Sequence, residues 1–266
     1  MLVVTSLLTS PVSRRGLDAR KPDGRPTQTP SAARGLPSAE DFGRAVRDMR
    51  AAEPEGAASH EAMEQALKIL DRAVMASLDG GGQDLLPIAN QRLTGYITRL
   101  PAAGEGYRLF RIGHGAAVYA LAANFGSSGP SAVRIYARSG PQEPFQLAGK
   151  IDRLSQKDYF DDYLEVVEVD SPDAVFVTVT GRTDELRSGS FASWRFDGKG
   201  VVELWSSDLL SHSSYEPIPG GIVITYCADS DEANPSVCRK KQRERHLWDG
   251  TTWKRVQQEE IPVTGR

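Results

Sequence analysis

The sequence has little of what several common kinds of site are built from. Its 266 residues include only two cysteines and four histidines, and the formal net charge is −3. The histidines lack the spacing of a metal site, so we predict neither a metal nor any other cofactor. So small a net charge produces no overall field to attract nucleic acid, and we expect no nucleic-acid partner. No apolar run approaches the roughly 20 residues that a membrane-spanning helix needs, so we expect no transmembrane segment.

The N-terminal residues 1–37 have the composition of a disordered leader. Residues 11–34 carry six Lys or Arg and two Asp among many Pro, Gly, Ser and Thr, which is too little apolar area to offset chain entropy. Residues 2–8 are apolar but lack the positive residues that precede the core of a secretory signal. Two interpretations stay open: the remnant of a signal sequence whose start codon is misassigned, or a plain leader.

Residues 38–82 are predicted to form a helical hairpin. Ser38 resembles the first residue of a capping box, and Ser59 can cap a second helix with an apolar stripe from Met63 to Leu78. Glycines 80–82 end that helix. We expect the stripe to pack on the part of the chain that follows, and we interpret 83–106 as a connecting segment that can supply an extra strand.

The remainder of the chain shows an internal repeat. In "RHLWDGTTWKRV" (245–256), Asp-Gly between apolar arms is typical of a β-hairpin closed by a two-residue turn. Asp249 follows Asp197 by 52 residues, and Tyr215 follows Tyr163 by the same 52. Tyr107 lies 56 residues before Tyr163, and each of the three tyrosines is followed by β-rich runs. The sequence therefore predicts copies of one unit.

The predicted β-repeat domain covers residues 107–260, with repeats at about 107–156, 163–209 and 215–260. Each repeat has four β-rich arms, and a period in the low fifties fits one four-stranded propeller blade. The fold class is therefore mainly β with N-terminal helices, in which three four-stranded antiparallel meanders form a partial propeller, an open barrel or a sandwich. Because three blades do not close a ring, completion by a second copy is a further alternative.

The four-strand period and the aromatic-Asp-Gly hairpins resemble those of bacterial exported propeller-like β-repeat proteins over about residues 107–260. The resemblance implies a propeller-like array of sheets and an exported protein. It carries no site residues over to this chain.

Two regions supply candidates for a binding surface. The stretch 158–173 contains seven acidic residues and no basic one, among them Asp161, Asp162 and Glu165. These side chains could form a solvated surface, attract a ligand, or act as the paired carboxylates of a glycosidase. His114 lies between two glycines in a loop and could contact a ligand or simply occupy a turn. The basic run 239–246, which ends at His246, is interpreted as a solvated edge strand that discourages aggregation between sheets.

Cys227 and Cys238 flank the turn between the second and third arms of the last repeat. These arms are antiparallel neighbours, so the two α-carbons can approach within the roughly 4.4 to 6.8 Å that a disulfide requires. We predict a disulfide, which favours a periplasmic or secreted location. The alternative is a pair of buried thiols in a reducing compartment.

No catalytic constellation is evident, so the sequence favours a non-catalytic binding or scaffolding protein over an enzyme. Its partner would be a protein or a glycan of unknown identity. One alternative is a glycan-acting hydrolase that uses the carboxylates of 158–173. The other is an assembly subunit that completes a ring as a homo-oligomer.

Overall fold

The computed structural model describes residues 36–52, 57–80, 85–97, 106–114, 117–125, 131–152, 163–181, 187–231 and 233–263. They all belong to one compact unit, Arg34–Arg266. The predictions for residues 1–35 lie outside the described part. Three helices come first: α1 (Ala39–Ala51), α2 (Ala57–Asp79) and α3 (Leu85–Ile97).

The segment 83–106 was wrongly interpreted as a connection with an extra strand, because residues 85–97 form the helix α3. Ala89, Leu93 and Tyr96 are all buried, and their spacing places them on one helix face. Pro87 is tolerated because it lies in the first turn, where its missing amide has no helical partner. Ser38 caps α1 as expected, since its hydroxyl accepts a hydrogen bond from the Glu40 amide at 3.1 Å.

The described residues after the helices form twelve strands in three four-stranded antiparallel sheets, which confirms the predicted fold class. In every sheet, each strand pairs with its neighbour in the sequence, so each sheet is a meander. The described sheets form an open series and close neither a barrel nor a ring. The first sheet contains β1 (Gly106–Arg111), β2 (Val118–Asn124), β3 (Ser131–Ala137) and β4 (Gln146–Asp152). The second contains β5 (Tyr163–Glu168), β6 (Ala174–Gly181), β7 (Gly189–Phe196) and β8 (Val201–Ser206). The third contains β9 (Ser214–Ile218), β10 (Gly221–Ser230), β11 (Cys238–Trp248) and β12 (Trp253–Ile261).

A β-bulge recurs at the same place in all three sheets. The ladder between the third and fourth strands shifts register at Ile135/Tyr136, at Ser193/Trp194 and at Arg245/His246. The extra residue on the fourth strand is Ala148, Leu204 or Val256, and these positions repeat the spacings of 56 and 52 residues seen for the three tyrosines. The repeat is therefore a repeat of backbone register as well as of sequence.

The Asp-Gly hairpins are real, but their turns have four residues instead of the two expected. Trp248 pairs with Trp253, and Phe196 pairs with Val201 in the preceding sheet. The Asp249 side chain accepts hydrogen bonds from two amides within its turn, and Gly250 has a φ of 91° that favours glycine. The aspartate's local hydrogen bonds thus select the longer loop.

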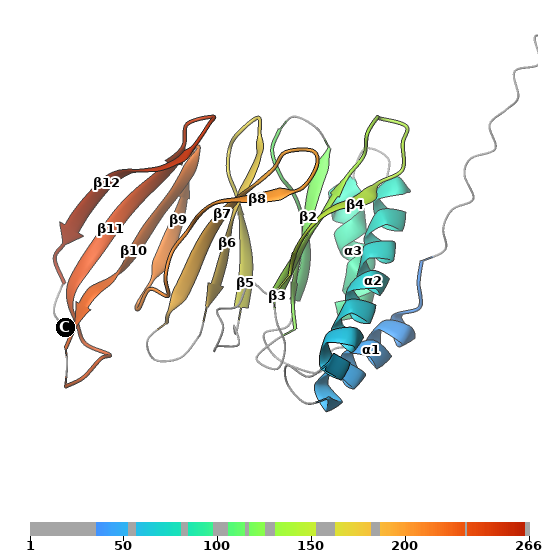
Figure 1. Ribbon diagram of the computed structural model, residues 1–266, viewed down its shortest axis with the longest axis horizontal. Helices are drawn as coiled ribbons and strands as arrows, with labels where there is room; N and C mark the ends of the chain where they lie inside the picture. The colour runs from blue at the N-terminus through green and yellow to red at the C-terminus, as the bar shows by residue number, and fades with distance from the viewer. Residues whose placement is uncertain are drawn as a thin grey trace, which may run out of the picture. The chain divides into compact units, whose positions relative to one another are not determined.

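The sheets stack face to face, with the helices at one end of the series (Figure 1). One apolar cluster joins the helices to the first sheet, a second joins the first and second sheets, and a third joins the second and third sheets. Alternation along β2 explains this arrangement. Tyr119 and Leu121 face the helices, whereas Val118 and Ala120 face the second sheet.

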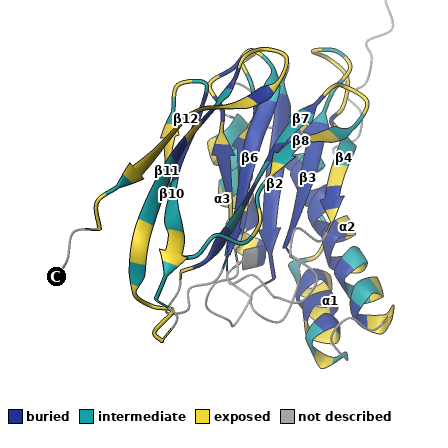
Figure 2. Cartoon of the chain, turned by 60° about the vertical axis from the view of Figure 1, so that its left-hand side comes forward, coloured by how far each residue is buried: buried dark blue, intermediate teal, exposed yellow. Residues whose placement is uncertain are grey.

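The stack ends differently on its two sides. At the helical end, the fully buried Arg134 of β3 pairs with Glu64 of α2 at 3.1 Å and with Asp152 of β4 at 3.3 Å. At the other end, the outer face of the third sheet presents Arg243 and Arg245, and exposed residues are frequent along β10–β12 (Figure 2). A charged face needs no further sheet to cover it.

Among the described helices, none combines the length and the apolar character needed to cross a membrane.

Candidate functional site

A cavity of about 790 Å³ runs along the first strands of the three sheets. We call it the first-strand cavity. Because β1, β5 and β9 are edge strands, the cavity follows one edge of the stack. Its volume lies in the range of small-molecule sites. It is lined by Tyr107, Arg108, Phe110, Ala122, Asn124, Tyr163, Leu164, Glu165, Val166, Val167, Glu168, Tyr215 and Pro217.

The three tyrosines that mark the sequence repeat all line this cavity. Tyr107 comes from β1, Tyr163 from β5 and Tyr215 from β9. Tyr107 is almost fully buried and packs edge-on against Phe42 and Phe125, so it forms part of the wall. Tyr163 and Tyr215 are only partly buried and can present ring surface to a ligand.

Glu165 and Tyr215 connect the second and third sheets across the cavity. The Tyr215 hydroxyl donates a hydrogen bond to Oε2 of Glu165. Burial raises the pKa of Tyr215, and this hydrogen bond and the nearby charge of Glu165 raise it further. The phenol therefore stays protonated and holds one carboxylate oxygen in place.

Glycine makes room for Tyr163. Gly181 pairs with Tyr163 between β6 and β5, and a Cβ at Gly181 would lie 2.6 Å from the tyrosine hydroxyl oxygen. The same Cβ would lie 2.2 Å from the carbonyl oxygen of Ser188. The Tyr163 ring thus lies over position 181, and any residue larger than glycine at that position would displace it.

The cavity carries charge of both signs. Arg108 stacks over Phe110, with its guanidinium carbon 4.7 Å from the ring centroid. Glu165 shares its face of β5 with Val167, which packs toward the third sheet. Glu168 lies on the opposite face, because odd and even positions of a strand alternate. The two carboxylates therefore flank β5 instead of converging on one point.

Of the residues predicted for a binding surface, the structure places Glu165 in the cavity. Asp161 and Asp162 lie outside the described residues. His114 does not line the cavity. It lies in the loop after β1, where its Nε2 is 2.8 Å from Oδ1 of Asp170, and both side chains are about 70% exposed (69% and 71%). The loop is held by backbone contact, since the His114 amide donates to the carbonyl of Ser171 at 3.1 Å.

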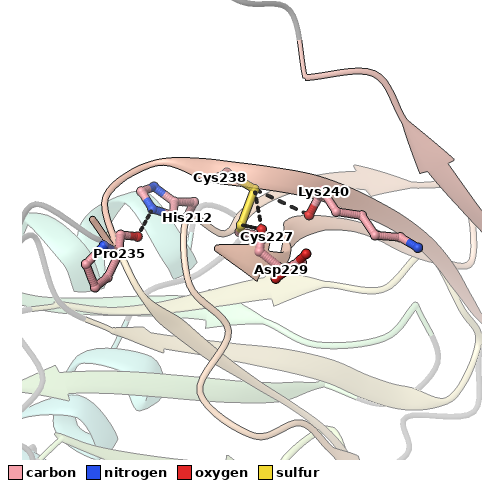
Figure 3. Close-up of a disulfide and its surroundings, with 6 residues drawn as sticks. All are labelled: His212, Cys227, Asp229, Pro235, Cys238 and Lys240. Atoms are coloured by element: carbon pink, nitrogen blue, oxygen red, sulfur yellow. Dashed lines mark hydrogen bonds between the residues drawn. A yellow bond between two sulfur atoms is a disulfide. The ribbon is translucent and has the colours of Figure 1, made fainter. Parts of the chain in front are cut away.

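The predicted disulfide between Cys227 and Cys238 is present, with the α-carbons 5.7 Å apart (Figure 3). It joins β10 and β11 at the end of their hairpin. His212 braces the same loop, since its Nε2 lies 3.3 Å from the carbonyl oxygen of Pro235. The bond is structural in placement, and neither cysteine lines the first-strand cavity.

Within the part of the chain that the structure describes, no group of three or more His, Cys, Asp or Glu side chains could hold a metal ion. Comparisons with protein-family models, with curated proteins and with solved structures find no match to this chain.

Sequence reasoning treated the tyrosines as markers of the repeat and did not recognise them as site residues. The signal was available, because equivalent positions on the first strand of every unit must lie along one edge if the units stack in register. Arg108 had no such signal. Arg108 and Phe110 are two residues apart on one face of β1, and an arginine at that spacing from an aromatic residue is too common in sequences to indicate a site.

Proposed function

We propose that this chain is a non-catalytic binding protein that holds a glycan in the first-strand cavity. One observation carries the proposal: the three repeat-equivalent tyrosines line a single cavity together with Glu165. Aromatic rings with a few polar groups are typical of sites that bind small molecules. Tyr163 and Tyr215 offer ring surface, while Glu165 and Arg108 offer hydrogen-bond acceptors and donors to sugar hydroxyls.

Titration with cellotetraose, maltotetraose and chitotetraose, followed by isothermal calorimetry, tests this function. We expect saturable binding of at least one tetrasaccharide and a weakening of about tenfold in Glu165→Gln, which costs about 1.4 kcal/mol. Glu143→Gln is the matched control, because Glu143 is exposed in the loop before β4 and does not line the cavity. Failure of all three glycans to bind, or equal binding by both variants, would contradict the proposal.

Hydrolysis receives less support than binding. A glycosidase needs two carboxylates on either side of one scissile bond at a defined separation. The described carboxylates of the cavity, Glu165 and Glu168, lie on opposite faces of β5. We therefore propose that a bound glycan is released uncleaved.

Completion of a ring by a second copy also receives little support. The outer face of the third sheet would have to be buried, and Arg243 there is paired with Glu216 at 3.4 Å on the exposed surface. Desolvating Arg243 and Arg245 would cost free energy. We propose that the stack ends at this face.

We further propose that the protein acts outside the cytoplasm, in the periplasm or as a secreted protein. The disulfide supports this location, since such bonds persist mainly in oxidising compartments. Thiol titration of denatured protein, isolated from its native compartment under alkylating conditions, should find no free thiol. Two free thiols would contradict export.

A further inference from the structure

A second cavity, of about 440 Å³, lies between the second and third sheets. Its walls are the inner face of the third sheet and the end of β8 with the segment that follows. None of the residues that line it also lines the first-strand cavity. It is lined by Trp205, Ser206, Ser207, Asp208, Leu210, Ile224, Tyr226, Glu244, His246 and Arg255.

A buried carboxylate organises this cavity. Only 9% of the Glu244 side chain is exposed, and it accepts hydrogen bonds from Tyr226 Oη at 3.0 Å and from Arg255 Nη1 at 2.8 Å. His246 Nε2 lies 3.0 Å from its other oxygen. Burial opposes the charge of Glu244, but these three hydrogen bonds outweigh it and lower the pKa of the carboxyl. Glu244 is therefore ionised and fixed in position.

His246 is left with an unused acceptor. Its side chain is 3% exposed, and burial lowers its pKa, so the ring is neutral near pH 7. A neutral ring that faces Glu244 through Nε2 carries its proton there, which leaves Nδ1 with a lone pair. Nδ1 is buried and has no hydrogen-bond partner among the described residues. A buried acceptor without a donor costs free energy, and this one belongs to a side chain that lines the cavity.

Trp205 adds a flat apolar surface. Its ring lies against His246 with the centroids 4.5 Å apart and the planes tilted by 36°. The indole is only partly buried and lines the cavity. The cavity thus combines an aromatic face with fixed donors and acceptors.

The charges of the lining residues indicate what kind of molecule fits. Arg255 and Glu244 are paired at 2.8 Å, so each neutralises the other, and the remaining charge, Asp208, is exposed to solvent. A neutral molecule with several hydroxyl groups can donate to the carboxylates, accept from the guanidinium and place its apolar face on Trp205. We propose that the second cavity binds the ring of a neutral monosaccharide. This site is independent of the first-strand cavity.

The test uses the full chain labelled with nitrogen-15, whose four tryptophans give four indole signals. Neutral D-glucose, D-galactose and N-acetyl-D-glucosamine are compared with cationic D-glucosamine and anionic D-glucuronate. We expect a saturable shift of the Trp205 signal, assigned from Trp205→Leu, with at least one neutral sugar. The charged sugars should bind at least about tenfold more weakly.

Variants separate this site from the first-strand cavity. Arg255→Gln should weaken binding about tenfold, and Lys254→Gln is its matched control, because Lys254 lies next to it on β12 and faces the opposite side. Absence of a shift with all neutral sugars, or tighter binding of either charged sugar, would overturn the proposal. So would sugar binding that Glu165→Gln weakens and Arg255→Gln does not, a result that would favour the first-strand cavity alone.

Discussion

The first and third sheets share one backbone register, but they meet the rest of the molecule in opposite ways. In the first sheet, every residue of β2 is buried, since helices cover one face and the second sheet covers the other. In the third sheet, β12 is exposed along most of its length. The same meander can therefore be an interior layer or a terminal one, depending on which side chains occupy its outward positions.

The difference also shows in how each sheet is held. The first sheet is fixed to the helices by apolar burial and by a buried ion pair around Arg134. In the third sheet β10, β11 and β12 are longer than any strand of the first sheet, the outer face carries charged side chains, and a disulfide lies at the far end of the longest hairpin. Burial stabilises one end of the stack, and a covalent link stabilises the other.

The largest effect is expected at the helical end. Leu70 of α2 is fully buried in the cluster that joins the helices to the first sheet. Leu70→Asp places an unpaired charge there and should lower the free energy of unfolding by several kcal/mol, about 3 to 5. Chemical denaturation measures the loss. Gln65→Asp, at an exposed position of the same helix, should cost less than about 1 kcal/mol, and equal losses in the two variants would mean an undocked helix.

The next effect is expected at the disulfide. Replacing Cys227 and Cys238 together by serine should cost about 3 kcal/mol on the chain-entropy model, because a short loop is no longer closed in the unfolded chain. Equilibrium unfolding of the double variant is compared with that of the oxidised protein. A loss larger than that of Leu70→Asp would break the contrast between the two ends.

A pH effect should have opposite signs at the two ends. Burial raises the pKa of Asp71, whose carboxyl accepts a hydrogen bond from Tyr136 at 2.6 Å beside the first sheet. The folded state then holds a proton that the unfolded chain releases near pH 4, so the contribution of Asp71 to stability falls as the pH rises through this window. Asp249 behaves in reverse. Lys254 and two turn amides lower its pKa, so its contribution is present above about pH 4 and is lost as the pH falls.

Urea unfolding at a series of pH values from about 2 to about 7 measures both contributions. The free energy of unfolding of the unchanged protein is compared at each pH with that of Asp71→Asn and that of Asp249→Asn. The stability difference caused by Asp71→Asn should move in the direction opposite to that caused by Asp249→Asn. Parallel pH profiles would show that the two carboxyls do not differ in environment.

The smallest effect is expected at the recurring bulge. Val256 is 53% exposed, whereas Leu204, at the equivalent position of the second sheet, packs against the cluster between the second and third sheets. Val256→Lys should change the free energy of unfolding by less than about 0.5 kcal/mol, and Leu204→Lys should cost about 1 to 3 kcal/mol. Thermal melts of the two variants measure these losses. Unequal losses would show that the environment of the bulge residue decides its contribution to stability, and equal losses would show that its position in the backbone register does.

Much of this fold could be predicted because the repeat is visible in single residues: the three tyrosines and the two Asp-Gly pairs fall where one unit requires them. The helix α3 was missed because the segment 85–97 is short and mixes polar with apolar positions, so its hydrophobic period is ambiguous. Arg134 was missed because a charged residue between Val133 and Ile135 ordinarily indicates a solvent-facing position. Only the helix packed on that face makes the position buried.

The candidate site could be predicted only in part. Glu165 attracted attention through local charge, but its hydrogen bond to Tyr215 joins residues 50 positions apart on different sheets. His246 was correctly expected on a strand, but the expected solvated edge was wrong, because β11 lies inside its sheet and His246 is buried. Sequence alone could not place His246 beside Trp205, which belongs to the preceding repeat. Contacts between stacked sheets depend on which faces meet, and no pattern within a single repeat determines that.

The meander order has a kinetic consequence. Every strand pairs with its immediate neighbour in the chain, so no pairing has to wait for a distant segment. Hairpins of this kind form within microseconds, and proteins dominated by local pairing fold faster than those whose strands must find remote partners. Each sheet can be completed as soon as its own residues are available. A chain that emerges N-terminus first could therefore build the stack one layer at a time, starting from the layer that the helices cover.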